Sequence, residues 1–165
     1  MFDFDYVEAF DRLLKYYYND CPGRVTPLLL LYLAQDSKLT ISNIIDGMKN
    51  GKLTAKTVGS GTLDVLATPI MIAKMEEAAW KAVADHLDEG AGSVGILMNA
   101  QHLSATPVGL EVTCKAELTT VDGRKLIYKV SAWDAKGPIG EGIHERAVIQ
   151  NERFVAKAYS KLEQV

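Results

Sequence analysis

The hydrophobic pattern is densest between residues 66 and 87, where it predicts a helix that organises the rest of the chain. Thr68 followed by Pro69 is typical of a helix start, because a threonine hydroxyl can cap a free N–H and proline fits the first helical position. The residues that follow are too apolar for a surface helix. We therefore expect a long and largely buried helix that ends near Leu87.

Glu76 interrupts one side of this helix. Residues four positions apart share a face, which gives a stripe of Thr68, Ile72, Glu76, Ala79 and Val83. Glu77 is an ordinary surface residue by comparison, since Lys74 and Lys81 are spaced to pair with it. A carboxylate on an apolar stripe either reaches water at the edge of the stripe or is kept for chemistry.

Four strands are predicted after the helix, and in the second of them apolar and polar residues alternate with a period of two, which is typical of a sheet with one buried face. Their ranges are Ser93 to Leu103, Leu110 to Val121, Arg124 to Asp134 and Ile139 to Gln150. Asp122-Gly123 predicts a hairpin turn, and Asn151 to Leu162 a closing helix or tail. One helix cannot cover both faces of such a sheet. We expect an α+β fold with an antiparallel sheet wrapped round the helix and its remainder buried in a second subunit.

Residues 1–50 differ in character and are assigned to a helical N-terminal extension, separate from a main domain at residues 51–165. Three short helices are predicted in the extension, the third from Leu39 to Met48, and Leu53 to Val58 can form a strand at the start of the main domain. A DNA-reading module is conceivable for such helices. A packing appendage is favoured because the extension has no basic recognition face.

Composition narrows the class of protein further. The formal net charge is −3, which gives no reason to expect a nucleic-acid partner. Two distant cysteines, Cys21 and Cys114, form no metal-ligand spacing and predict reduced thiols in a cytoplasmic protein. No basic signal-peptide region opens the chain. The longest apolar run, Leu28 to Ala34, is far short of the ~20 residues that span a membrane, so no membrane partner is expected.

Three histidines are the candidates for acid–base chemistry. His86 follows the helix, His144 lies in the last strand, and His102 ends the first long strand just before a turn. A lone histidine in such a position is more often structural than catalytic. No cluster of histidine, cysteine or carboxylate residues has metal-ligand spacing, and no glycine loop has the spacing of a phosphate-binding motif. We therefore predict no metal site.

Several motifs together carry a family resemblance from about Leu53 to Phe154. The chain resembles the hotdog-fold acyl-CoA thioesterases of the fluoroacetyl-CoA thioesterase type. The match to this family has no insertion or deletion between Thr68, Glu76 and His102. The matching segments are Val58-Gly59-Ser60-Gly61, Ala67-Thr68-Pro69-x-Met71-x-x-x-Met75-Glu76, Asn99-x-x-His102-x-x-Ala105-Thr106-Pro107-x-Gly109, Val121-Asp122-Gly123-Arg124 and Ile139-Gly140-x-Gly142-x-His144-Glu145-Arg146.

This resemblance implies a hotdog fold, a homodimer or higher homo-oligomer, and hydrolysis of an acyl-CoA to the free acid and coenzyme A. It implies a catalytic set of Thr68, Glu76 and His102, and acyl-group placement by Gly95 and Arg146. No cofactor is implied beyond the coenzyme A of the substrate. Fluoroacetyl-specific members carry an aromatic lid and gate where this chain has Gly59 and Thr62. An ungated pocket for another small or medium acyl-CoA is therefore expected.

Thioester hydrolysis needs a nucleophile, a base and donors for the oxyanion. Thr68 is either the nucleophile or the group that orients it, His102 the base, and Glu76 orients the imidazole or activates water. Free N–H groups just after Thr68 are candidate oxyanion donors. Along one helix Thr68 and Glu76 lie about 12 Å apart, so we expect the working site to span two subunits.

Two other functions stay open from the sequence alone. A non-catalytic acyl-CoA-binding module is the alternative to hydrolysis, with the N-terminal helices relaying the ligand state to a partner. Glu76 argues against it, because a binding module has no use for a carboxylate on an apolar stripe. A hotdog dehydratase is disfavoured, since the usual pair of histidine and carboxylate residues is not recognised.

Overall fold

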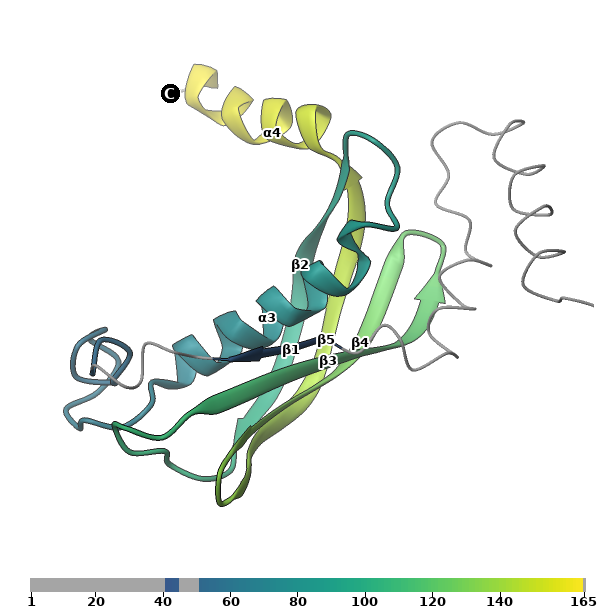
Figure 1. Ribbon diagram of the computed structural model, residues 1–165. Helices are drawn as coiled ribbons and strands as arrows, with labels where there is room; N and C mark the ends of the chain where they lie inside the picture. Colours follow the sequence, from purple (N-terminus) through teal and green to yellow (C-terminus); the bar gives the residue numbers. More distant parts are fainter. Residues whose placement is uncertain (1–40, 45–50, 165) are drawn as a thin grey trace, which may run out of the picture.

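Five antiparallel strands form one curved sheet in the computed structural model, which describes residues 41–44 and 51–164 (Figure 1). The strand order is β1-β3-β4-β5-β2, so β1 and β2 are the edges of the described sheet. The strands are β1 (Ile41–Ile44), β2 (Ala91–His102), β3 (Val112–Asp122), β4 (Lys125–Asp134) and β5 (Gly137–Gln150). The four strands predicted after the helix are confirmed, with bounds that differ by up to two residues.

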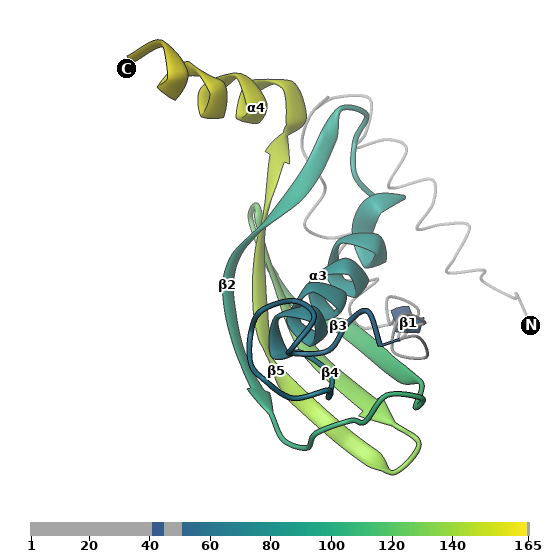
Figure 2. The ribbon, with the colours of Figure 1, turned by 90° about the vertical axis from the view of Figure 1, so that its left-hand side faces the viewer.

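The helix α3 (Thr68–Ala84) lies along the concave side of this sheet (Figures 1 and 2). Its predicted burial is confirmed, because six of its apolar residues contribute to the core: Met71, Met75, Ala78, Ala79, Ala82 and Val83. They meet the inward-facing residues of β3 and β4, and those of β3 alternate as predicted: Val112, Cys114, Ala116, Leu118, Leu126, Tyr128 and Val130. A sheet wrapped round a helix is the architecture expected from the alternation of apolar residues.

Two predicted elements are wrong. Ile41–Ile44, within the predicted third helix, is the strand β1 and pairs with β3 from Ile41↔Ala116 to Ile44↔Thr113. Long-range pairing along an open sheet edge overrides a weak local helical pattern here. Residues 53–58, predicted as a strand, form turns in which the Thr54 and Thr57 side chains bond each other's backbone. The other helices predicted for residues 1–38 lie outside the described residues.

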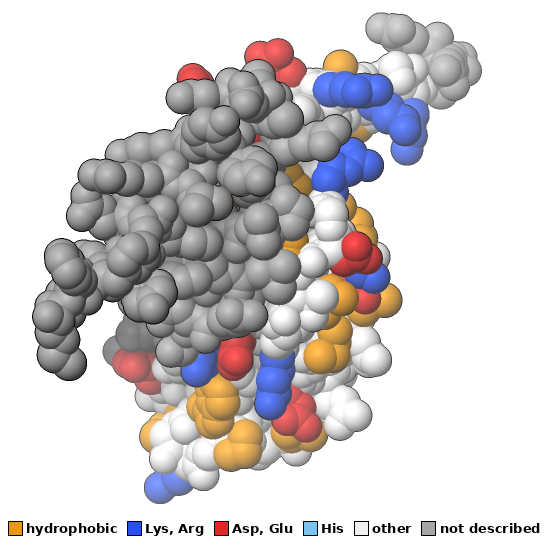
Figure 3. Space-filling model, turned by 90° about the vertical axis from the view of Figure 1, so that its right-hand side faces the viewer, with side chains coloured by type: hydrophobic (Ala, Val, Ile, Leu, Met, Phe, Trp, Pro, Cys, Tyr) orange, Lys and Arg blue, Asp and Glu red, His pale blue; other side chains and the backbone are white. Residues whose placement is uncertain are grey.

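The chain ends in an exposed helical segment. The helix α4 (Asn151–Tyr159) is followed by the short 3₁₀ helix η3 (Ser160–Gln164), and no residue of α4 is buried. Both ribbon views show α4 standing off the end of β5, away from the sheet and α3. Lys and Arg side chains gather at the upper end of the molecule in Figure 3, where α4 lies. The predicted closing helix is therefore confirmed, and none of its residues is buried against the rest of the described chain.

One of the two cysteines lies in the core. Cys114 is fully buried, and its thiol donates a long, weak contact of 4.0 Å to the Met71 carbonyl. Burial raises the pKa of this thiol to about 12, so Cys114 is neutral at ordinary pH. Cys21 lies outside the described residues. Among the described residues, no helix combines the length and apolar character needed to cross a membrane.

Candidate active site

Thr68 and His102 are brought into contact at the start of α3. The Thr68 Oγ1 and the His102 Nδ1 are 2.8 Å apart, although the two residues are 34 positions apart in the chain. This contact replaces the predicted capping role of Thr68, because Ala67 is the N-cap and no side-chain cap bond is made. Since the threonine hydroxyl can donate to the neutral imidazole, the pair is arranged for proton transfer from oxygen to nitrogen.

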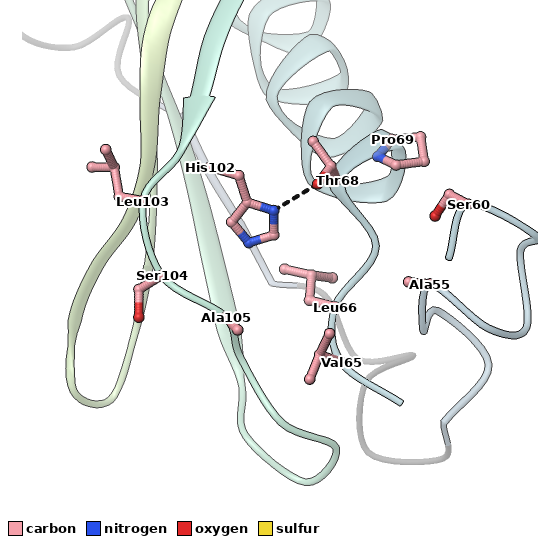
Figure 4. A pocket seen from close by; sticks show the side chains of 10 residues that line it. All are labelled: Ala55, Ser60, Val65, Leu66, Thr68, Pro69, His102, Leu103, Ser104 and Ala105. Atoms are coloured by element: carbon pink, nitrogen blue, oxygen red, sulfur yellow. Dashed lines mark hydrogen bonds between the residues drawn. The ribbon is translucent and has the colours of Figure 1, made fainter. Parts of the chain in front are cut away.

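A hollow of about 390 Å³ lies beside this pair. Figure 4 shows Ala55 and Ser60, from the turns before α3, on one side of it and Leu103 and Ser104, after β2, on the other. The Nε2 of His102 is buried and has no hydrogen-bond partner within the described part of the chain. An imidazole with an unfulfilled hydrogen bond can still engage a further polar group.

The first turn of α3 offers fewer free N–H groups than predicted. The N–H of Ile70 donates to the Ala67 carbonyl at 3.0 Å, and Pro69 has no N–H. The oxyanion donors expected just after Thr68 are therefore not both free. The N–H of Thr68 itself is the donor left in this first turn among the described residues, at the positive end of the helix dipole.

Glu76 lies at a second place, two turns along α3. Its side chain is 42% exposed, and its Oε1 is 3.8 Å from the Nε2 of His144, a fully buried residue. Gly95 on β2 makes room for the carboxylate, because a Cβ at that position would lie 2.5 Å from Glu76 Oε1. Glu76 thus reaches water at the edge of the buried face while it borders a buried polar group. Glu77 pairs with Lys74 and Lys81 as predicted.

Arg146 is held by neutral acceptors beside this carboxylate. Its Nε donates to the Ser93 Oγ at 2.9 Å, its Nη2 to the Ser93 carbonyl at 2.6 Å, and its Nη1 lies 3.1 Å from His144 Nε2. Only 6% of Arg146 is exposed, and burial lowers the pKa of its guanidinium. Arg146, Glu76 and Gly95 line an open hollow of about 570 Å³, together with Trp80.

The five predicted site residues therefore form two groups within one chain. Thr68 and His102 line the first hollow, and Glu76, Gly95 and Arg146 line the second, with no lining residue in common. Glu76 does not contact His102 in the single chain. The described residues also contain no cluster of three or more histidine, cysteine or carboxylate side chains that could hold a metal.

His144 and Ser93 also take part in the second group. The sequence named His144 as a candidate histidine and as part of a family motif but assigned it no role, and it did not single out Ser93. His144 precedes Arg146 by two positions on β5, so both side chains lie on the same face of the sheet, whereas Glu145 faces the other way and pairs with Lys125 at 2.7 Å. The two-residue spacing of His144 and Arg146 could therefore have indicated from the sequence that the two side chains lie side by side. The contact with Ser93 depends on the pairing of β2 with β5, which no local pattern shows.

Comparison with known proteins gives consistent matches. A family model described as fluoroacetyl-CoA-specific thioesterase matches residues 50–152. The fluoroacetyl-CoA thioesterase of Streptantibioticus cattleyicolor is 48% identical over 98 residues, which are 59% of this chain and 70% of that protein.

Solved structures agree with these matches. A crystal structure of the fluoroacetyl-CoA-specific thioesterase FlK is 38% identical, with a TM-score of 0.68, and the match covers 74% of this chain and 93% of that one. A related FlK structure contains fluoroacetate and CoA and matches with the same identity and TM-score over 73% of this chain and 98% of that chain. A hot-dog-like protein from Thermanaerovibrio acidaminovorans, 21% identical, has a TM-score of 0.65 over 74% of this chain and 89% of its own, and supports the fold alone.

Proposed function

Because the chain belongs to the fluoroacetyl-CoA-specific thioesterase family, we propose that it hydrolyses a small or medium acyl-CoA to the free acid and coenzyme A. Thr68, Glu76 and His102 carry the reaction in this proposal. The observation that supports it best is the hydrogen bond between Thr68 and His102 beside an open hollow, at the N-terminal end of a buried helix.

The Thr68–His102 pair can start the reaction. His102 takes the hydroxyl proton through Nδ1 while Thr68 Oγ1 attacks the thioester carbonyl or aligns a water molecule that does so. The Thr68 N–H and the dipole of α3 stabilise the oxyanion that forms. The imidazolium then returns a proton to the departing thiolate. Water completes the hydrolysis, so no metal or redox cofactor is required beyond the coenzyme A of the substrate.

Glu76 joins this pair from a second subunit in our proposal. The helix α3 is continuous from Thr68 to Ala84, so Glu76 stays about 12 Å along the axis from Thr68 in the same chain. The edge strand β2 has no neighbour on its outer side in the described sheet and exposes Ile96 and Leu97. Long unpaired edges with exposed apolar residues favour pairing with a second chain. A homodimer joined along β2 would supply a carboxylate for the unpartnered Nε2 of His102.

The acyl group is placed by Gly95 and Arg146. Gly95 leaves the floor of the second hollow open, and the buried guanidinium of Arg146 provides a fixed positive charge there. Gly59 and Thr62 are exposed in the turns ahead of α3, and neither is aromatic. An ungated entrance favours an acyl group other than fluoroacetyl.

The proposal is tested by thiol release from a panel of acyl-CoAs, from acetyl to phenylacetyl. Wild-type protein is compared with Thr68→Ala, Glu76→Ala and His102→Ala, and Glu117→Ala serves as the control because Glu117 is an exposed residue of β3 that lines neither hollow. We expect turnover of at least one substrate, and His102→Ala to lower kcat by about a hundredfold or more with the fold intact. Saturable acyl-CoA binding without turnover would overturn hydrolysis and indicate an acyl-CoA-binding module.

A further inference from the structure

We propose that His144 is a positioning residue of the acyl-CoA reaction: its neutral ring, protonated on Nδ1, holds Arg146 in place beside Glu76. The inference rests on the proposed function, since it assigns a role in the same site. In this arrangement a second proton on His144 releases Arg146 and turns the ring toward the Glu76 carboxylate.

The hydrogen bonds of His144 fix which ring nitrogen carries the proton. The Nδ1 lies 2.8 Å from the Leu97 carbonyl oxygen, which can only accept, so Nδ1 is the donor. The Nε2 of the neutral ring is then an acceptor. It lies 3.1 Å from the Arg146 Nη1, which can only donate. Both ring nitrogens are therefore satisfied by one tautomer and by no other.

The hydrogen bond to His144 is the third of the bonds that hold the guanidinium of Arg146. Ser93 on β2 accepts from two nitrogens of the guanidinium, and His144 on β5 accepts from the third. Arg146 is thereby held in one orientation between two adjacent strands. Without the His144 acceptor, a buried N–H of a charged group would lose its partner and the guanidinium could turn within its plane.

Three charged or titratable groups of the described chain face His144, one from its own strand and two from neighbouring elements. Glu76 comes from α3, Arg146 from β5, and Tyr128 from β4 at 6.2 Å between ring centroids. Burial is the main cause that lowers the pKa of His144, and the positive charge of Arg146 lowers it further, against opposing contributions from the Leu97 carbonyl and Glu76. The neutral ring is therefore the form present at neutral pH.

Acidification reverses the bonding of Nε2. A proton on Nε2 makes it a donor that faces the donor of Arg146 at 3.1 Å, which is repulsive. The nearest carboxylate oxygen, Oε1 of Glu76, is 3.8 Å away and can accept after a small movement. Because the pKa of His144 is lowered on folding, folded-state stability is fully present above the ordinary histidine pKa and is lost as pH falls through that value toward the folded pKa.

Two substitutions separate positioning from simple packing. His144→Gln places an acceptor where Nε2 lies and cannot be protonated, whereas His144→Asn keeps only the donor to Leu97. We expect His144→Asn to lower kcat/KM for the best acyl-CoA by about tenfold or more, and His144→Gln to stay within about threefold of wild type. We also expect His144→Gln to remove one acidic limb from the pH profile. His86→Gln, at the far end of α3, is the matched control and should change neither.

Nitrogen-15 NMR of labelled histidine gives a readout that does not depend on turnover. The His144 signal is assigned by its loss in His144→Gln, and at neutral pH it should show a neutral ring protonated on Nδ1. A ring protonated on Nε2 or on both nitrogens at neutral pH would overturn the inference, as would His144→Asn kinetics equal to wild type in a folded protein. If no acyl-CoA is turned over, the proposed function fails separately, and the NMR result still decides the tautomer.

Discussion

Gly95 is the residue whose smallness matters most to the candidate site. A side chain there would meet two groups at once, because a Cβ would lie 2.5 Å from Glu76 Oε1 and 3.1 Å from His144 Cε1. A distance of 2.5 Å cannot persist, so the carboxylate of Glu76 must move if a methyl group is added. The strand itself can accept alanine, since Gly95 has no positive φ.

We therefore expect Gly95→Ala to lower kcat by about tenfold while it shifts the thermal unfolding midpoint by only a few degrees. Steady-state kinetics and thermal unfolding measure the two effects. A double-mutant cycle with Glu76→Ala locates the cause: Gly95→Ala should have little further effect when Glu76 is already gone. Equal losses in both backgrounds would mean that Gly95 acts independently of Glu76.

Single residues show how far the sequence could predict this site. The helical spacing marks Glu76 as unusual, and the family motifs identify the residues that line both hollows. The role of Thr68 was wrong in one respect, since its hydroxyl bonds His102 and does not cap α3. Capping rules consider only donors and acceptors that are close in the sequence. His102 is distant from Thr68 in the sequence and comes into contact with it because β2 runs beside α3 and ends near its first residue.

Among the helices and strands, α4 stands out because none of its residues is buried. Its exposed apolar residues, continued into η3, are Phe154, Val155, Tyr159 and Leu162, between 45 and 72% exposed. Their spacing puts them on one face of the helix, with Arg153, Lys157 and Lys161 on the other. The register Ala91↔Gln150 places the start of α4 beside the first residue of the edge strand β2.

Removal of α4 separates its contribution to folding from its contribution to self-association. We expect a chain that ends at Asn151 to keep its unfolding midpoint in dilute solution, because no residue of α4 is buried, and its circular dichroism to lose only the helical contribution of α4 and η3. Analytical ultracentrifugation should show weaker dimerisation, since the apolar face is lost. The double variant Arg153→Ala and Lys157→Ala is the control for the basic face and should dimerise normally. A fall in the unfolding midpoint of the dilute protein would contradict this expectation.

At the scale of elements, the sequence predicted α3, α4 and the strands β2 to β5, but it did not predict the first strand, β1. The period-two alternation of β3 is strong because one face is buried, so its position was evident. Ile41–Ile44 has too few residues to show any period, and its pairing with β3 is non-local. The β-branched side chains of Thr54 and Thr57 favour a strand, but their hydroxyl groups bond the backbone locally and stabilise the turns at residues 53–58.

For the whole molecule, the separation of the two hollows leads to a testable prediction about whether the working site combines residues of two subunits. If the working site combines Thr68 and His102 of one subunit with Glu76 of the other, two inactive variants can complement each other. Mixing Glu76→Gln with His102→Ala under conditions that exchange subunits should restore about a quarter of wild-type activity, because half of the dimers are mixed and each carries one intact site. Thiol release from the best acyl-CoA measures the recovery.

The matched control is a mixture of Thr68→Ala with His102→Ala. Both residues lie in the same hollow of one chain, so no mixed dimer regains an intact pair and no activity should return. Recovery in neither mixture, with subunit exchange demonstrated by mass, would place the complete site within one chain.

The family and the hotdog architecture were predicted correctly at this scale, because motifs and patterning depend on many residues at once. The proposed distribution of the site over two subunits would depend on pairing along the edge of β2, and no local sequence pattern predicts pairing across such an edge. The helical assignment of residues 1–38 stays a prediction.

The burial of Cys114 has a consequence for an enzyme whose proposed product is itself a thiol. Exchange with a disulfide of coenzyme A requires a thiolate that can be approached from solvent. Cys114 offers neither, since it is fully buried and its pKa is raised to about 12. Coenzyme A that accumulates and oxidises to a disulfide therefore cannot form a mixed disulfide with Cys114. The packing between α3 and β3 is protected from this modification.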